Sequence, residues 1–246
     1  MCIGLAYGIL LHRGSMAAVI EARGVWKIYE TAANRVEALR DLNVSFGTGE
    51  MVAVMGPSGC GKTTLLNCLS GLDDLTAGEV FIENSPLFAS GDRIRTSLRA
   101  EHFGFIFQSF NLILVLSAVE NVEMPLQLAG VGRTEARQRA MQALEMVGLA
   151  DWASHRPMEL SGGQQQRVTI ARAFVHEPAM ILGDEPTGNL DSKTSEEVMR
   201  LLFRLNKEKG TTMLIVTHDP DIASQCGRVL YMEDGRIVRD EKSEEE

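Results

Sequence analysis

The chain has 246 residues, 45% of them apolar and 23% charged, and can bury a large core without disulfides or metal ions. Its net charge of −9 argues against a nucleic-acid-binding surface, which needs a basic face. The four cysteines (Cys2, Cys60, Cys68, Cys226) form no CxxC pair and no zinc-ligand spacing. They are typical of thiols kept free in a reducing compartment.

Residues 1–15 contain an apolar stretch, Ile3–Leu11, that is shorter than the roughly 18–20 residues of a membrane span. It differs from a secretory signal because His12 and Arg13 follow it instead of preceding it. We expect a disordered extension, or an artefact of an early start codon ahead of Met16. A short membrane-surface anchor is the alternative. Residues 16–246 are expected to form a single domain.

The remaining sequence alternates between strand and helix patterns. Alternating apolar residues over 18–23 and 36–46 predict antiparallel strands with one solvated face. After a turn at 47–50, the apolar run 51–55 predicts a strand buried on both faces. A helix over 62–69 and a strand over 79–82 follow.

The pattern becomes helical from about residue 110 to residue 173. Residues 133–147 show apolar positions at helical spacing, and Gly148 follows as a typical C-terminal glycine. A strand at 179–182, a helix at 194–208, a strand at 212–217 and a hairpin around Asp234-Gly235 complete the chain. This order predicts an α/β fold with a mostly parallel sheet core, an antiparallel β subdomain and an inserted α-helical subdomain at about residues 109–173.

Residues 56–64 match the phosphate-loop pattern in full, with a strand before them and a helix after them. Glycines let consecutive N–H groups point at phosphate oxygens, and the helix start adds its positive end. Lys62 is expected to reach the β- and γ-phosphates of a nucleotide, and the Thr63 hydroxyl to hold Mg²⁺. The expected nucleotide-binding residues here are Gly56, Pro57, Ser58, Gly59, Cys60, Gly61, Lys62, Thr63 and Thr64.

Two acids, Asp184 and Glu185, end the apolar strand that follows residue 178. We expect Asp184 to hold Mg²⁺ and Glu185 to polarise the attacking water, because phosphoryl transfer depends on positioning and charge neutralisation. A helix N-cap is the alternative for one of them. Gly183 before them is expected to weaken the strand.

The run Ser161-Gly162-Gly163-Gln164 precedes a helix, so that small residues and a helix N-terminus form a second anion site. Together with the phosphate loop and the paired acids, this run resembles the signature of the ATP-binding cassette (ABC) family. The family pattern extends from Tyr29 to His218. The resemblance implies a P-loop NTPase (RecA-like) core and a single ABC ATPase domain over residues 16–246.

The resemblance also implies roles for residues that carry no signal alone. Gln108 would touch Mg²⁺ or the attacking water, His218 would contact the γ-phosphate, and Tyr29 would stack on adenine. An edge-strand tyrosine is the alternative for Tyr29. In the family, the signature closes on the γ-phosphate held by a second copy, and Asp191 belongs to a loop at that interface.

Three segments, 107–112, 120–126 and 183–191, resemble one branch, the ATPases of lipoprotein-releasing complexes and macrolide-type exporters. We therefore expect an ATPase that uses ATP and Mg²⁺ at the cytoplasmic face of the membrane. Its partners would be a second copy of itself and a separate membrane permease, with no nucleic acid. A regulatory ABC ATPase of the cell-division type is the alternative, and a soluble ABC ATPase acting on DNA or ribosomes is a weaker one.

Overall fold

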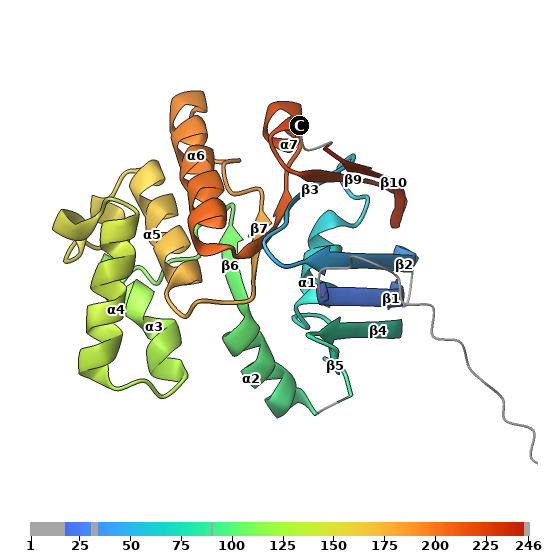
Figure 1. Cartoon of the computed structure of the whole chain (residues 1–246), viewed down its shortest axis with the longest axis horizontal. Coiled ribbons are helices and arrows are strands. Elements are labelled where there is room, and N and C mark those ends of the chain that lie inside the picture. The colour runs from blue at the N-terminus through green and yellow to red at the C-terminus, as the bar shows by residue number, and fades with distance from the viewer. Residues whose placement is uncertain (1–17, 31–33, 90, 244–246) are drawn as a thin grey trace, which may run out of the picture.

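The larger of two sheets carries the segment that precedes the phosphate loop. A computed structural model of the chain describes residues 18–30, 34–89 and 91–243; the expected extension at 1–15 and Cys2 lie outside them. The sheet has six strands in the order β10-β9-β3-β8-β7-β6 (Figure 1). Five are parallel, and only β10 pairs antiparallel. They are β3 (Met51–Met55), β6 (Phe103–Phe107), β7 (Met180–Asp184), β8 (Thr212–Val216), β9 (Arg228–Glu233) and the antiparallel β10 (Arg236–Lys242).

The smaller sheet is antiparallel, as the alternation predicted, and has the order β2-β1-β4-β5. Its strands are β1 (Ala18–Glu30), β2 (Arg35–Gly47), β4 (Ala77–Ile82) and β5 (Ser85–Pro86). Because side chains alternate along a strand, β3 serves two cores: Met51 and Ala53 belong to one cluster, and Val52 and Val54 to the other. The buried thiols of Cys68 and Cys226 pack in these clusters, and burial raises the pKa of each to about 12.

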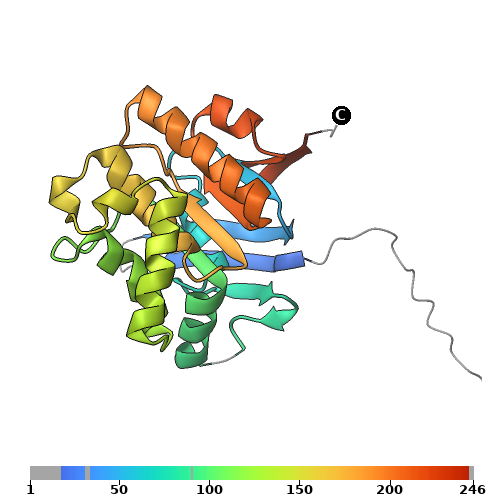
Figure 2. The same ribbon diagram turned by 60° about the vertical axis from the view of Figure 1, so that its left-hand side comes forward.

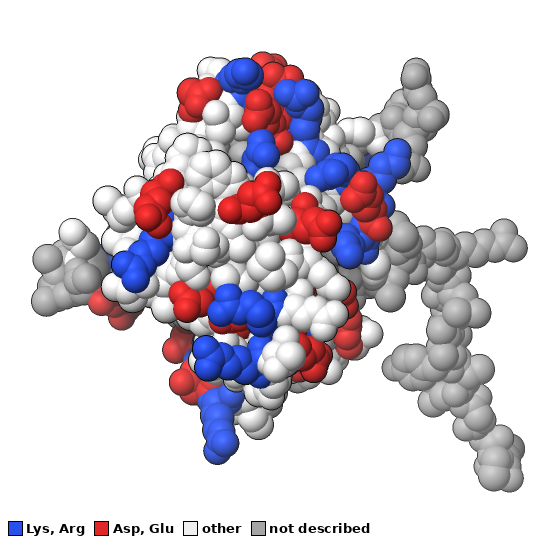
Figure 3. All heavy atoms as spheres, turned by 90° about the vertical axis from the view of Figure 1, so that its left-hand side faces the viewer, with Lys and Arg blue, Asp and Glu red and all other residues white. Residues whose placement is uncertain are grey.

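Helices cover the larger sheet on the side opposite the antiparallel sheet (Figures 1 and 2). The helical subdomain lies between β6 and β7, as predicted, and contains α3 (Ala118–Leu128), α4 (Arg133–Met146) and α5 (Gly162–Phe174). Its helices are joined by ion pairs such as Arg137–Glu123, and Figure 3 shows basic and acidic side chains interspersed over this face. Two 3-10 turns, Ala150–Trp152 and Pro157–Glu159, precede α5. The other helices are α1 (Lys62–Leu69), α2 (Asp92–His102), α6 (Ser192–Lys209) and α7 (Pro220–Ser224).

Three local expectations differ from the structure. The helical pattern was expected from residue 110, but α3 begins at Ala118, because Ser117 caps it and residues 108–117 form a loop. The helix α2 was not predicted, since it has no buried residue and thus no clear apolar stripe. Gly183 does not interrupt β7, which pairs there with Ile106 on one side and Ile215 on the other.

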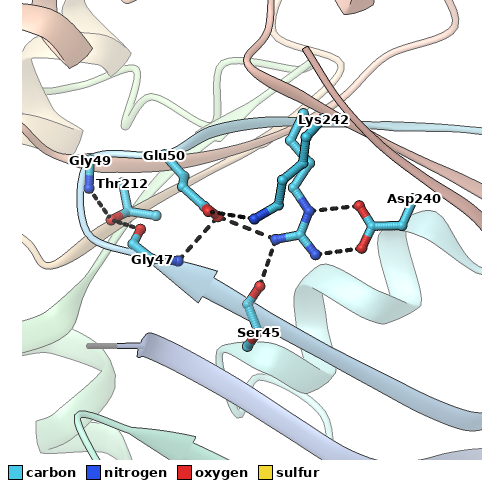
Figure 4. A network of polar contacts seen from close by, with 8 residues as sticks. Ser45, Gly47, Gly49, Glu50, Thr212, Asp240 and Lys242 are labelled. Carbon is cyan, nitrogen blue, oxygen red and sulfur yellow. Dashed lines mark hydrogen bonds and ion pairs between the residues drawn. The ribbon is translucent and has the colours of Figure 1, made fainter. Parts of the chain in front are cut away.

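A polar network fastens the β9–β10 hairpin to the rest of the fold (Figure 4). The Arg228 side chain is 9% exposed, and its guanidinium donates two hydrogen bonds of 2.7 Å to Asp240 of β10. It also donates to the Ser45 carbonyl at 2.7 Å and to Glu50 at 3.2 Å. The hairpin is thereby joined to β2 and to the turn before β3. This network lies at the end of β3 away from the phosphate loop, since Arg228 pairs with Val52. The turn of the hairpin lies beside the loop and has its own bond there, from the Gly235 N–H to the Cys60 carbonyl.

Candidate functional site

The phosphate loop connects β3 to α1 in a conformation that its glycines permit. Gly56, Gly59 and Gly61 all have positive φ, and a side chain on Gly56 would collide with the backbone of Met232. The Lys62 ammonium donates to the carbonyls of Gly56 at 2.8 Å and Pro57 at 2.9 Å. Since Gly61 caps α1 without a side chain, the first N–H groups of α1 can bind an anion.

The two acids lie beside this loop because β7 ends there. The Thr63 hydroxyl donates to Asp184, with oxygen–oxygen distances of 3.0 and 3.3 Å. Burial, reinforced by Glu185, raises the pKa of the Asp184 carboxyl above its ordinary value. A hydroxyl and a carboxylate at this separation are a donor set that suits Mg²⁺. Neither acid caps a helix, so the N-cap alternative is excluded.

Glu185 is placed by the neighbouring strand. Its backbone has a φ of 46°, and its N–H donates to the Val216 carbonyl at the end of β8. His218, two residues further along that chain, has its Nδ1 3.2 Å from a Glu185 carboxylate oxygen. The arrangement fixes a carboxylate and an imidazole together next to Asp184, where they can orient a water molecule.

Gln108 follows β6, on the other side of β7, and contacts Asn189, which belongs to the predicted Asp191 loop but was not among the predicted site residues. Its backbone carbonyl accepts from Asn189 Nδ2 at 3.0 Å, and its amide nitrogen is 3.5 Å from Asn189 Oδ1. A side chain on Gly188 would come within 3.0 Å of that same amide. The only sequence signal for Asn189 was its place beside Asp191.

Tyr29 lies at the end of β1 and is 39% exposed. Its hydroxyl donates to Asp73 at 2.6 Å, and the Lys27 ammonium lies 4.7 Å from the ring centroid. Burial and the hydrogen bond to Asp73 raise the pKa of Tyr29 to about 12. The ring is therefore held firmly, but stacking on adenine stays a prediction.

These residues surround one cleft of about 880 Å³. Tyr29, the phosphate loop, Gln108, Asp184, Glu185 and His218 all line it. Two arginines of β2, Arg35 and Arg40, also line the cleft. Sequence reasoning missed them because β2 showed only strand alternation. The volume and the cationic, N–H-rich wall suit a nucleotide with its phosphates.

The signature run begins α5 at a distance from this cleft. Ser161 accepts from the Gln164 N–H at 3.3 Å, and the Gln164 side chain accepts from the Ser161 N–H at 2.9 Å, which completes a capping box. Of the described residues that line the cleft, none comes from 161–164. A single copy therefore does not bring its signature to its own phosphate loop.

Asp191, also expected at the site, caps α6. Its carboxylate accepts from the Thr194 N–H at 3.0 Å and from the Thr194 hydroxyl at 2.6 Å. These bonds hold the pKa of Asp191 below its ordinary value. Gly163 of the signature packs against Thr194, so closely that a Cβ on Gly163 would lie within 3.0 Å of Thr194 Cγ2. The signature and the Asp191 loop thus form one contact between α5 and α6.

A phosphate loop between a central strand and a helix, with acids at the end of a nearby parallel strand, defines a P-loop nucleoside triphosphatase. A model of the ABC transporter family matches residues 39–188. The chain belongs to the ABC transporter family, and it is an ATPase of that family. The sequence prediction of the family, the fold class and the enzyme class is confirmed.

Individual relatives support the same assignment. An uncharacterized ABC transporter ATP-binding protein of Thermotoga maritima is 48% identical, over 90% of this chain and 94% of the relative. The uncharacterized ABC transporter ATP-binding protein MJ0796 of Methanocaldococcus jannaschii is 46% identical, over 91% and 97%. A macrolide export ATP-binding/permease protein, MacB 1 of Yersinia pestis, is 46% identical over 94% of this chain but only 35% of its own length.

Solved structures of related cassettes have the same fold. A dimeric structure of MJ0796 in a post-hydrolysis state, bound to ADP and Pi, has a TM-score of 0.83 and 44% identity, and covers 91% of this chain and 98% of its own. A second dimeric structure of MJ0796, a bacterial ABC transporter cassette, has the same TM-score and coverage at 45% identity.

Proposed function

We propose that this chain is the ATP-hydrolysing subunit of an ABC transporter, and that ATP-dependent homodimerisation lets it drive a separate membrane permease. The observation that carries the proposal is the division of two phosphate-binding surfaces within one copy. The phosphate loop lines the cleft, and the signature at the start of α5 does not. Two copies packed head to tail would place each signature over the other copy's cleft.

The residues of the cleft have distinct tasks in this proposal. The N–H groups of residues 58–64 and the Lys62 ammonium bind the β- and γ-phosphates, and Tyr29 stacks on adenine. Glu185 accepts the proton of the attacking water, and His218, 3.2 Å away, holds that carboxylate in place and contacts the γ-phosphate. Gln108 orients the water. Mg²⁺, when bound, neutralises phosphate charge, and Thr63, Asp184 and Gln108 would hold it.

The second copy would supply Ser161, Gly162, Gly163 and Gln164 to the γ-phosphate. The N-terminus of α5 offers N–H groups and the positive end of its helix dipole to this anion. Asp191 would lie at the interface, and its cap on α6 would keep that loop in register with the signature. The dimers named for MJ0796 support this arrangement.

The permease would dock beside the loop that follows Gln108. Ile113, Leu114 and Val115 of this loop are exposed, Val115 by 76%, which is costly for apolar side chains without a partner. The buried Asn121 side chain fixes their position, since it accepts from the Ile113 N–H and donates to the carbonyls of Ile113, Leu116 and Ser117. An apolar cytoplasmic helix of a permease is the partner that such a surface fits.

In the described part of the chain, no helix is both long and apolar enough to cross a membrane. As part of this proposal, the membrane-spanning part of the transporter is a separate polypeptide, and this chain acts at the cytoplasmic face of the membrane. The likeness to MacB, named as an export protein, favours a role in export or mechanotransmission.

Replacing Glu185 by glutamine tests the proposal. ATP binding should persist, turnover should fall about a hundredfold or more, and ATP should convert the monomer to a dimer in size-exclusion chromatography. Ser161→Arg in the same chain should abolish that dimer while leaving ATP binding intact. Glu196→Gln, an exposed change on α6, is the control for loss of one carboxylate. Wild-type turnover in the Glu185 variant would rule out Glu185 as the base. A dimer that still forms in the Ser161→Arg variant would rule out the paired mechanism.

A further inference from the structure

The loop after Gln108 contains a backbone turn of high energy. Phe110 and Asn111 are consecutive residues with φ values of 59° and 49°, in the left-handed region. Asparagine tolerates this region, whereas a bulky residue such as phenylalanine is rarely found there. Two local backbone hydrogen bonds lie within the turn, from the Phe110 N–H to the Phe107 carbonyl and from the Asn111 N–H to the Ser109 carbonyl. Such a conformation persists only where surrounding groups hold it.

Arg172 of α5 is the group that contacts this turn. One guanidinium nitrogen donates to the Asn111 carbonyl at 2.6 Å, and the other donates to the Phe110 carbonyl at 3.0 Å. Both carbonyls of the left-handed pair are therefore bound by one planar fork. A lysine ammonium cannot reproduce that geometry, because it is a point charge without a fixed fork.

The charge of Arg172 is committed to these two carbonyls. Among the residues that the structure describes, Arg172 forms no ion pair and no other side-chain hydrogen bond. Burial lowers the pKa of Arg172 below its ordinary value, and no neighbouring carboxylate offsets that effect. Burying a charge is costly unless hydrogen bonds offset the cost, and the two bonds to this turn are the ones that Arg172 has.

The turn also lies close to the beginning of the same helix, α5. The Phe110 ring lies 3.8 Å from the position of a Cβ on Gly162, in the signature. The turn thus lies beside the signature at the start of α5 and is bound to the same helix further along through Arg172. Gln108, two residues before the turn, is held on its other side by Asn189.

We propose that Arg172 is a positioning residue: its guanidinium holds the Phe110–Asn111 turn, and through it Gln108, in a fixed position relative to the signature helix. This proposal rests on the role of Gln108 and of the signature under the proposed function. A movement of the loop caused by the permease would then reach the signature directly, and a change at the signature would reach Gln108.

The test compares Arg172→Lys with the double variant Arg172→Lys/Asn111→Gly in the purified full chain. Arg172→Lys should lower kcat about tenfold with little change in KM for ATP, since a misplaced Gln108 acts on the chemical step. Glycine adopts the left-handed region more readily than asparagine does, so Asn111→Gly should recover part of that loss. Arg139→Lys is the matched control. Arg139 is another arginine of this subdomain whose guanidinium donates to a backbone carbonyl, that of Val175, but it does not contact the turn.

Hydrogen exchange measures the turn independently of catalysis. In Arg172→Lys, the amides of Phe110 and Asn111 should exchange about tenfold faster, and those of Arg139→Lys should match the wild type. Unchanged exchange at these two amides, or a double variant no more active than Arg172→Lys alone, overturns the proposal. Gln108→Ala identifies a different failure: if that variant keeps the wild-type kcat, the role of Gln108 is wrong, while the exchange result still decides whether Arg172 holds the turn.

Discussion

Replacing Gly163 by alanine tests the contact between the signature helix and α6. The new Cβ would lie within 3.0 Å of Thr194 Cγ2, and the Thr194 side chain cannot rotate away without breaking the hydrogen bond from its hydroxyl to Asp191. Overpacking of this kind costs about 1–3 kcal/mol. Alanine in a helix returns up to about 1 kcal/mol relative to glycine. The net loss in the free energy of unfolding should be about 1–2 kcal/mol.

A second substitution should reverse that loss. Thr194→Ser removes the methyl group but keeps the hydroxyl that binds Asp191, and the next nearest atom to the new Cβ is then 3.8 Å away. The serine alone costs at most about 0.8 kcal/mol. The double variant should therefore be within about 1 kcal/mol of the wild type, with a coupling free energy of about 1–2 kcal/mol.

The measurement is urea unfolding without nucleotide, followed by the fluorescence of the two tryptophans. Gly162→Ala is the control, since its Cβ would meet Leu190 at an ordinary 3.4 Å and should not destabilise the fold. If Gly163→Ala is as stable as Gly162→Ala, or if Thr194→Ser leaves its effect unchanged, the packing argument is refuted.

Three further predictions concern the loop, the hairpin and β7. Lys62→Ala should weaken ATP binding more than about tenfold, measured with a fluorescent ATP analogue, because it removes the only lysine in the loop; unchanged affinity would contradict this. Arg228 holds the pKa of Asp240 below its ordinary value, so their bond stabilises the fold above about pH 4 and is lost as the pH falls through the lowered value. Thermal unfolding of Asp240→Asn should lack that acid-dependent step, and a step as large as in the wild type would argue against it. Gly183→Ala would place a Cβ 2.7 Å from Ile215 Cδ1. It should destabilise by about 1 kcal/mol, and Ile215→Val, which removes that atom, should suppress the effect in the same unfolding assay.

The sequence predicted those parts of the fold in which a local pattern and the final structure agree. The phosphate loop needs a strand, glycines and a helix in succession, and all three are visible in residues 51–69. The helical insertion and the hairpin at Asp234 were recognised for the same reason. The helix α2 was missed because Ile94 and Leu98 are its only large apolar residues, and none of its residues is buried.

The contacts between distant segments were beyond the sequence. Asn189 reaches Gln108 across 81 positions, and Arg172 reaches Phe110 across 62. No periodicity or motif records such pairs, because they arise only when β6 and β7 come together. The cap that Asp191 forms on α6 could have been predicted locally, because the helix begins directly after this aspartate. The sequence interpretation assigned Asp191 only the interface role that the family resemblance implies.

The order of strands in the larger sheet has a consequence for the synthesis of the protein. The strand before the phosphate loop, β3, has β8 and β9 as its neighbours, with Met51 opposite Met213. A ribosome must therefore add roughly 160 residues after β3, about ten to thirty seconds of elongation, before either neighbour exists. During that time Val52 and Val54 lack both of their strand neighbours, and the antiparallel sheet and α1 are the parts of their core cluster that are made first. The nascent chain thus has an unpaired central strand, prone to aggregation and accessible to chaperones, for most of its translation. Slower elongation would lengthen that period.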